Sequence, residues 1–146
     1  MKNKAVKLSL AATAFFFLAA AGLAVWAPWL VGRYARFRGI GDAGRTAILA
    51  AFYCCLGPAL AALCCLWLLL RNIQKERPFL KENSRLMAII SWCCVLVALA
   101  TGVAAVWYLP LLFVTLSMAF IFLIVRVVRN CFIAAIVLKE ENSLTI

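Results

Sequence analysis

Cysteine is the reactive residue type that this 146-residue sequence contains in quantity. Its seven cysteines are Cys54, Cys55, Cys64, Cys65, Cys93, Cys94 and Cys131. Neighbouring cysteines on a helix point about 100° apart and do not readily form a disulfide. The sequence also contains no CxxC motif. We therefore interpret cysteine here mainly as a small apolar residue suited to close helix packing.

Four of these cysteines allow a second interpretation, as metal ligands. Cys64, Cys65, Cys93 and Cys94 fall at similar depth on two predicted helices that follow each other in antiparallel order. Four thiolates in such an arrangement could hold a metal ion. A membrane thiol or metal sensor is therefore kept as an alternative hypothesis.

Arg126 and Arg129 are charged residues near the end of the last predicted membrane span. An arginine at the centre of a bilayer costs about 2.5–3.5 kcal/mol on insertion scales. Counted from Pro110, Arg126 falls near the end of its helix, where a long side chain can reach the interface. These arginines are predicted to be interfacial anchors, and they are candidates for binding an anionic lipid.

Acidic residues and histidine are missing from the long apolar stretches of this sequence. Proton relays and ion-coupling sites usually require such groups, and haem ligation by histidine requires a histidine, which the chain lacks. No nucleophile–base pair and no phosphate-binding loop can be recognised. We therefore expect no enzyme activity and no cofactor.

The elements that position these residues are predicted to be four membrane-spanning helices. Residues without charge run over 8–32, 46–70 and 86–125, and a bilayer crossing needs about 20 apolar residues. The last stretch is too long for one span, and Pro110 marks the start of a new helix within it. The predicted fold is all-α: an integral membrane four-helix bundle forming one domain over 1–146, with spans near 8–31, 46–70, 86–106 and 111–130.

Small residues predict the packing faces of two of these helices, because lipid favours close backbone approach through small side chains. In the second span they are Ala50, Cys54, Gly57, Ala61 and Cys65; in the third they are Cys94, Ala98, Gly102 and Ala105. Pro58 is expected to kink the second span. The basic start of the chain resembles a signal peptide, but its apolar run exceeds the usual 7–15 residues and predicts a retained helix.

The basic residues predict the orientation. One side of the membrane would carry Lys2, Lys4, Lys7, Arg71, Lys75, Arg77, Lys81, Arg85, Arg126, Arg129 and Lys139, and the other only Arg33, Arg36, Arg38 and Arg45. The positive-inside rule then places both termini, the loop 71–85 and the tail 131–146 in the cytoplasm. The net charge of +10 follows from these flanking residues, so we expect contact with anionic lipid and no direct binding of nucleic acid.

Two groups of residues resemble a family of uncharacterised bacterial membrane proteins, the domain of unknown function 2975. The first is Arg71-Asn72-Ile73 with Pro78-Phe79, Glu82-Asn83 and Arg85-Leu86. The second is Arg129-Asn130, Phe132, Ala135 and the run Leu138 to Asn142 with Leu144-Thr145-Ile146. The resemblance covers the chain from Arg71 onward, and the first half agrees in having two spans.

The resemblance implies a four-span protein in the bacterial cytoplasmic membrane, without catalytic residues. It also suggests a small cytoplasmic helix-turn-helix transcriptional regulator as partner. On this hypothesis the protein tethers or signals to the regulator through a surface formed by the second loop and the tail. The candidate residues are Pro78, Phe79, Glu82, Asn83, Glu140, Glu141, Asn142, Leu144, Thr145 and Ile146.

A second hypothesis is a small transporter, channel or lipid-binding protein, which could be a homo-oligomer. Pro58, the arginines of the first loop, and the pair Arg126 and Arg129 motivate it. The lipid bilayer is the one partner that all these hypotheses share.

Overall fold

Four long helices make up the computed structural model, which describes residues 2–75 and 81–144. They are α1 (Lys2–Arg38), α2 (Asp42–Gln74), α3 (Lys81–Ala104) and α4 (Leu111–Leu144). All four are long and apolar enough to cross a membrane. The predicted all-α class and the four spans are confirmed, and the chain is a multi-pass membrane protein. α1, α2 and α4 extend beyond their predicted spans, whereas α3 begins before its predicted span and ends at Ala104, short of the predicted residue 106.

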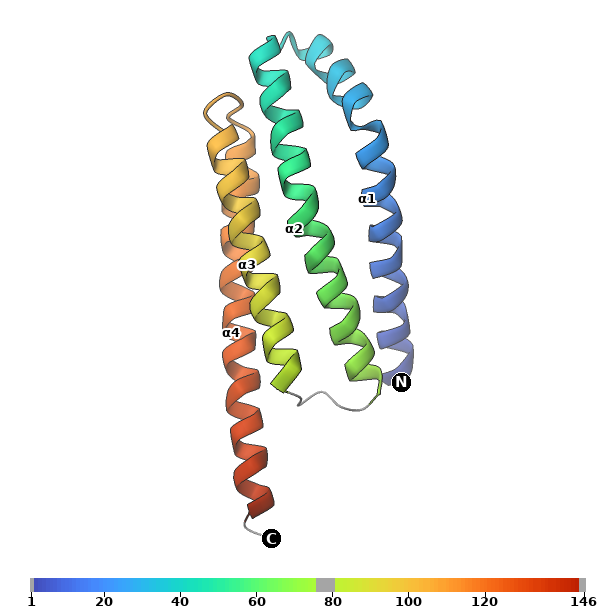
Figure 1. Cartoon of the computed structure of the whole chain (residues 1–146), viewed down its shortest axis with the longest axis vertical. Coiled ribbons are helices and arrows are strands. Elements are labelled where there is room, and N and C mark those ends of the chain that lie inside the picture. Colours follow the sequence, from blue (N-terminus) through green and yellow to red (C-terminus); the bar gives the residue numbers. More distant parts are fainter. Residues whose placement is uncertain (1, 76–80, 145–146) are drawn as a thin grey trace.

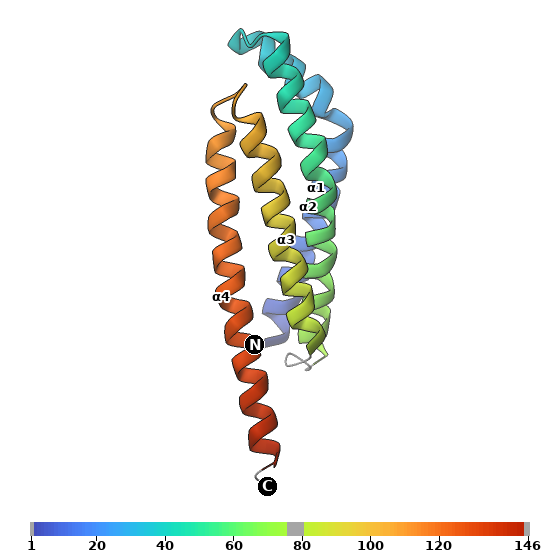
Figure 2. The ribbon, with the colours of Figure 1, turned by 60° about the vertical axis from the view of Figure 1, so that its left-hand side comes forward.

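The helices run up and down in sequence order (Figure 1). Within the described residues, close backbone approach joins α1 to α2, α2 to α3 and α3 to α4. A second view shows α4 on one flank of α3 and α1 behind α2 (Figure 2). We call the end with the two chain termini the terminal end, and the end with the α1–α2 and α3–α4 connections the hairpin end.

The α1–α2 connection is much shorter than predicted, because Gly39 ends α1 abruptly. Gly39 has a φ of 65°, a backbone conformation that glycine adopts without strain. Its N–H donates to the Arg36 carbonyl at 3.4 Å, and the Ile40 N–H donates to the Ala35 carbonyl at 2.9 Å. These two bonds form a Schellman motif. The arginines assigned to a loop therefore lie on the ends of two helices.

The face of α2 that packs on its neighbours differs from the predicted one. Gly57 and Ala61 are exposed, whereas Gly44, Ala51, Cys65 and Leu69 are buried. Gly44, Ala51 and Cys65 fit a repeat of seven residues, and that repeat also includes Pro58 and Asn72. Such a period is typical of helices that cross at a shallow angle. Of the five residues predicted for the packing face, Cys65 is buried and the other four are exposed, so the sequence prediction placed most of the face wrongly.

The α3–α4 hairpin follows the prediction closely. α3 ends at Ala104 and α4 begins at Leu111, directly after Pro110. Below the turn, the hydroxyls of Thr101 and Thr115 lie 2.9 Å apart in a hydrogen bond between the two helices. Each hydroxyl also lies within hydrogen-bond distance of a backbone carbonyl of its own helix, 2.9 Å from Val97 for Thr101 and 3.2 Å from Leu111 for Thr115.

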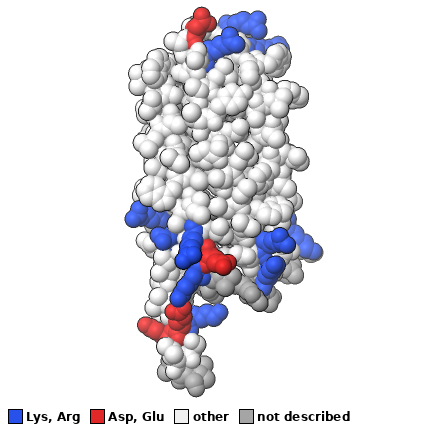
Figure 3. Space-filling model, viewed as in Figure 1, with Lys and Arg blue, Asp and Glu red and all other residues white. Residues whose placement is uncertain are grey.

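Charged side chains gather at the two ends and leave a charge-free belt between them, as Figure 3 shows for one face. The belt corresponds to the charge-free residues 8–32, 46–70 and 86–125. At the terminal end, α4 continues well past the other helices (Figures 1 and 2). It was predicted to end near Asn130, but it remains helical to Leu144.

Candidate functional site

A polar clamp joins α2 to α3 at the terminal end. The side chain of Asn83 is fully buried, and its Oδ1 accepts a hydrogen bond from Asn72 Nδ2 at 2.8 Å. A buried amide requires such a partner, because an unpaired polar group in apolar surroundings is costly. Asn83 was predicted to lie on a partner-binding surface. Its burial makes the side chain unavailable to a partner, and we assign it to helix packing instead.

A second polar contact joins α3 to α4 at the same end. Arg129 Nε donates to the backbone carbonyl of Ser84 at 3.2 Å. The guanidinium of Arg126, one turn earlier, lies 5.8 Å from the centre of the Phe122 ring, in the range of a cation–π contact. The sequence reasoning identified both arginines but not these partners, because Ser84 and Phe122 carry no charge or motif.

A cleft between α3 and α4 brings these two arginines together. It has a volume of about 290 Å³ and is lined by Ala88, Ser91, Trp92, Val95, Phe122, Arg126 and Arg129. Arg126 is exposed and Arg129 is half-buried. The cleft thus combines two guanidinium groups with apolar and aromatic walls, an arrangement that suits an anionic head group attached to an apolar chain.

The last part of α4 forms a projecting segment, which we define as residues 131–144. Val137, Leu138 and Leu144 are exposed there, and so are Glu140 and Glu141. Lys81 Nζ lies 3.3 Å from Glu140 Oε1, and both side chains are largely exposed. An ion pair of this kind adds little stability, but it links the projecting segment to the start of α3.

The second loop is described only in part. Pro78, Phe79, Thr145 and Ile146, four of the predicted partner-binding residues, lie outside the described residues. Glu82 and Asn142 are exposed at the terminal end. Of the predicted surface, the structure therefore places Glu82, Glu140, Glu141, Asn142 and Leu144 in exposed positions.

The cysteines do not gather into one site. Cys65, Cys93 and Cys94 are buried, whereas Cys64 is exposed and lines a groove with residues of α1. Within residues 2–75 and 81–144, no three cysteine, acidic or histidine side chains form a cluster that could hold a metal. Cys93 and Cys94 instead line an apolar groove with Pro58.

One feature at the hairpin end was missed by the sequence reasoning. Arg36 and Arg45 belong to different helices but line one pocket, together with Trp29 and Gly32. The short connection through Gly39 brings the two arginines together. The sequence had predicted a longer loop here, so the pocket was not expected. A glycine followed closely by a second glycine, as at Gly39 and Gly41, was the available signal for a tight turn.

Comparison with known proteins places the chain in a family. No curated protein and no solved structure gave a match. The profile of a family described as protein of unknown function, DUF2975, matches residues 4–146. This match includes α1 and α2, so it extends over the first half of the chain, where the sequence resemblance had rested on the number of spans alone. The protein is therefore a member of the DUF2975 family.

Proposed function

We propose that this protein is a non-enzymatic module of the bacterial cytoplasmic membrane that tethers a small cytoplasmic helix-turn-helix regulator. The observation that carries the proposal is the projecting segment of α4, whose last turns extend past the ends of α2 and α3 (Figures 1 and 2). At 1.5 Å per residue, the helix continues for roughly 20 Å beyond Asn130. This segment lies outside the charge-free belt.

An apolar stripe follows one side of the projecting segment. Ile133, Val137 and Leu144 recur at spacings of four and seven residues, so they share one face of the helix. All three side chains are exposed, with 38%, 47% and 87% of their surface accessible. An amphipathic helix that lays such a face into an apolar groove is a common mode of protein recognition.

The position of this stripe favours a soluble partner over lipid. Lys139, Glu140 and Glu141 follow Val137 and Leu138 directly, and carboxylates are unfavourable within a bilayer. The Arg129–Ser84 contact anchors the base of this segment to α3. A small regulator bound there would be held at the membrane, away from DNA.

The test is recovery of the partner from native membranes. We expect the full-length protein to co-purify with a small DNA-binding protein, and the variant Val137→Ser with Leu144→Ser to lose it. Leu138→Ser is the matched control, because Leu138 is also apolar and exposed but lies about 100° around the helix from Val137. Retention of the partner by the stripe variant, or recovery of no soluble protein, would contradict the proposal.

Binding of an anionic lipid is a second candidate function, which the cleft of Arg126 and Arg129 favours. Arg126→Gln is expected to weaken binding of an anionic phospholipid by about fivefold, the equivalent of ~1 kcal/mol per interfacial cation. Arg85→Gln removes an exposed charge of the same end and serves as control. Equal losses in the two variants would show a general charge effect and not a site.

A further inference from the structure

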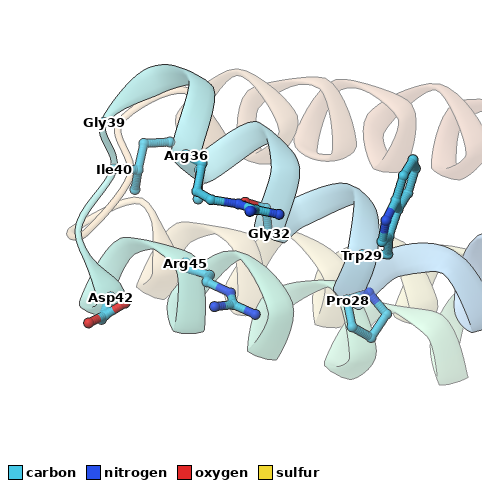
Figure 4. Close-up of a pocket in the computed structure, with 9 residues that line it drawn as sticks. Pro28, Trp29, Gly32, Arg36, Gly39, Ile40, Asp42 and Arg45 are labelled. Carbon is cyan, nitrogen blue, oxygen red and sulfur yellow. The ribbon is translucent and has the colours of Figure 1, made fainter.

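A pocket at the hairpin end lies between the last turns of α1 and the first turns of α2 (Figure 4). Its volume is about 520 Å³. Pro28 and Trp29 form its apolar part, while Arg36 and Arg45 enter it from different helices. Because Gly32 is the last residue of a charge-free run, the pocket lies at an edge of the charge-free belt.

The two guanidinium groups approach the same glycine. Arg36 Nε donates to the Gly32 carbonyl at 3.3 Å. A Cβ atom added to Gly32 would lie 3.5 Å from Arg45 Nη2, so the guanidinium of Arg45 lies against this residue from the side of α2. Two positive charges from separate helices therefore face one pocket, and their repulsion is reduced when an anion lies between them.

Within the described residues, these two charges are neutralised only in part. Among the described residues, neither Arg36 nor Arg45 forms an ion pair with a carboxylate. Asp42 lines the pocket, but it lies in the first turn of α2, where a negative charge stabilises the helix dipole. Two guanidinium groups against one carboxylate leave the lining with a net positive charge.

We propose that this pocket binds the phosphate group of an anionic phospholipid. Guanidinium groups bind phosphate oxygens through short, charge-assisted hydrogen bonds. Pro28 and Trp29 offer an apolar and aromatic wall on the side of the belt, as the glycerol and upper acyl chain of a lipid require. The proposal is independent of the regulator tether, because the pocket and the projecting segment lie at opposite ends of the molecule (Figure 1).

Native mass spectrometry of the full-length protein in detergent, titrated with phosphatidylglycerol, tests this site. Arg36→Gln and Arg45→Gln are each expected to weaken lipid binding about fivefold, at ~1 kcal/mol per interfacial cation. Arg38→Gln is the matched control, because Arg38 is an exposed arginine at the end of α1 that does not line the pocket. Equal affinity in all three variants would overturn the proposal.

Two further variants separate a bound ligand from a loss of folding. Asp42→Asn removes the opposing carboxylate and is expected to tighten lipid binding. Gly32→Val would place a Cβ atom 3.5 Å from Arg45 Nη2 and crowd the guanidinium with methyl groups, so it is expected to weaken lipid binding. Thermal unfolding in the same detergent verifies that each variant is folded. A decrease in affinity with Asp42→Asn would contradict the proposed electrostatics.

Inorganic phosphate distinguishes a lipid head group from a soluble anion. If the site takes a lipid, millimolar phosphate should displace little phosphatidylglycerol, because the ion lacks the apolar part that contacts Pro28 and Trp29. The lipid assignment would be overturned if phosphate displaced phosphatidylglycerol at low concentration and if this phosphate binding were lost in Arg45→Gln.

Discussion

Single polar side chains determine how the ends of these helices are joined. Asn83 is fully buried, and Asn72 donates a hydrogen bond to it across the α2–α3 interface. At the hairpin end, the hydroxyls of Tyr34 and Tyr108 share a hydrogen bond between α1 and the α3–α4 turn. Such bonds between helices matter because lipid offers no hydrophobic drive for helix association.

Replacement of Asn83 by alanine should destabilise the protein by about 1–3 kcal/mol, because it removes a buried hydrogen bond and leaves the Asn72 amide without this partner. Unfolding by a denaturing detergent in mixed micelles measures the change. Asn130→Ala is the control, since Asn130 is an exposed asparagine of α4. If the two variants have equal stability, Asn83 does not contribute through its burial.

The hydrogen bond with Tyr34 affects the ionisation of the Tyr108 hydroxyl. The hydrogen bond with Tyr34, followed by partial burial, raises the pKa of Tyr108 above its ordinary value of 10.0. The stabilisation that this provides is therefore fully present below pH 10.0 and is lost as the pH rises through the raised pKa. Tyr34→Phe should lower the pKa of Tyr108 in an ultraviolet absorbance titration, whereas Tyr53→Phe should leave it unchanged.

At the scale of whole helices, α2 packs on its neighbours through residues that recur every seven positions, most of them small. Ala51 belongs to this repeat and is buried, while Ala61 belongs to the predicted face and is exposed. Both alanines occupy the same helix and have the same chemistry. They therefore distinguish the observed packing face from the predicted one.

Ala51→Leu should destabilise the protein by about 1–3 kcal/mol, because the added methylenes overpack a close helix contact. Ala61→Leu should have an effect near zero, since the larger side chain would enter lipid. Detergent unfolding of the two variants measures the difference. A larger loss from Ala61→Leu would show that the exposed face is itself a contact, as in a homo-oligomer.

Prediction from sequence succeeded where it depended on composition. It failed where it depended on which side of a helix packs, or on the backbone conformation of a single residue. Charge-free runs located all four helices, and Pro110 located the α3–α4 turn. Most residues predicted for the contact face of α2 are exposed, because small residues occur on several sides of that helix and do not indicate which side packs. The Arg36–Arg45 pocket was missed because it depends on the backbone conformation of Gly39.

At the scale of the whole molecule, the charges at the two ends predict the direction of insertion. Eleven basic residues belong to the terminal end in the sequence, from Lys2 to Lys139, against Arg33, Arg36, Arg38 and Arg45 at the hairpin end. The positive-inside rule then predicts a cytoplasmic terminal end. The regulator tether requires this orientation, whereas the lipid pocket does not, because anionic lipid can be present on either side.

Labelling of introduced cysteines in intact cells tests this orientation. Gly41 has a φ of −64°, and a Cβ atom there would meet nothing within 4 Å, so Gly41→Cys should be tolerated. Ser143→Cys reports on the exposed projecting segment, with the exposed Cys131 replaced by serine in both variants. A membrane-impermeant maleimide should label Gly41→Cys in intact cells and Ser143→Cys only after permeabilisation. The reverse pattern would place the projecting segment outside the cell and remove the basis for a cytoplasmic partner. The lipid site at Arg36 and Arg45 would then face the cytoplasmic leaflet, and its predicted dependence on both arginines would remain.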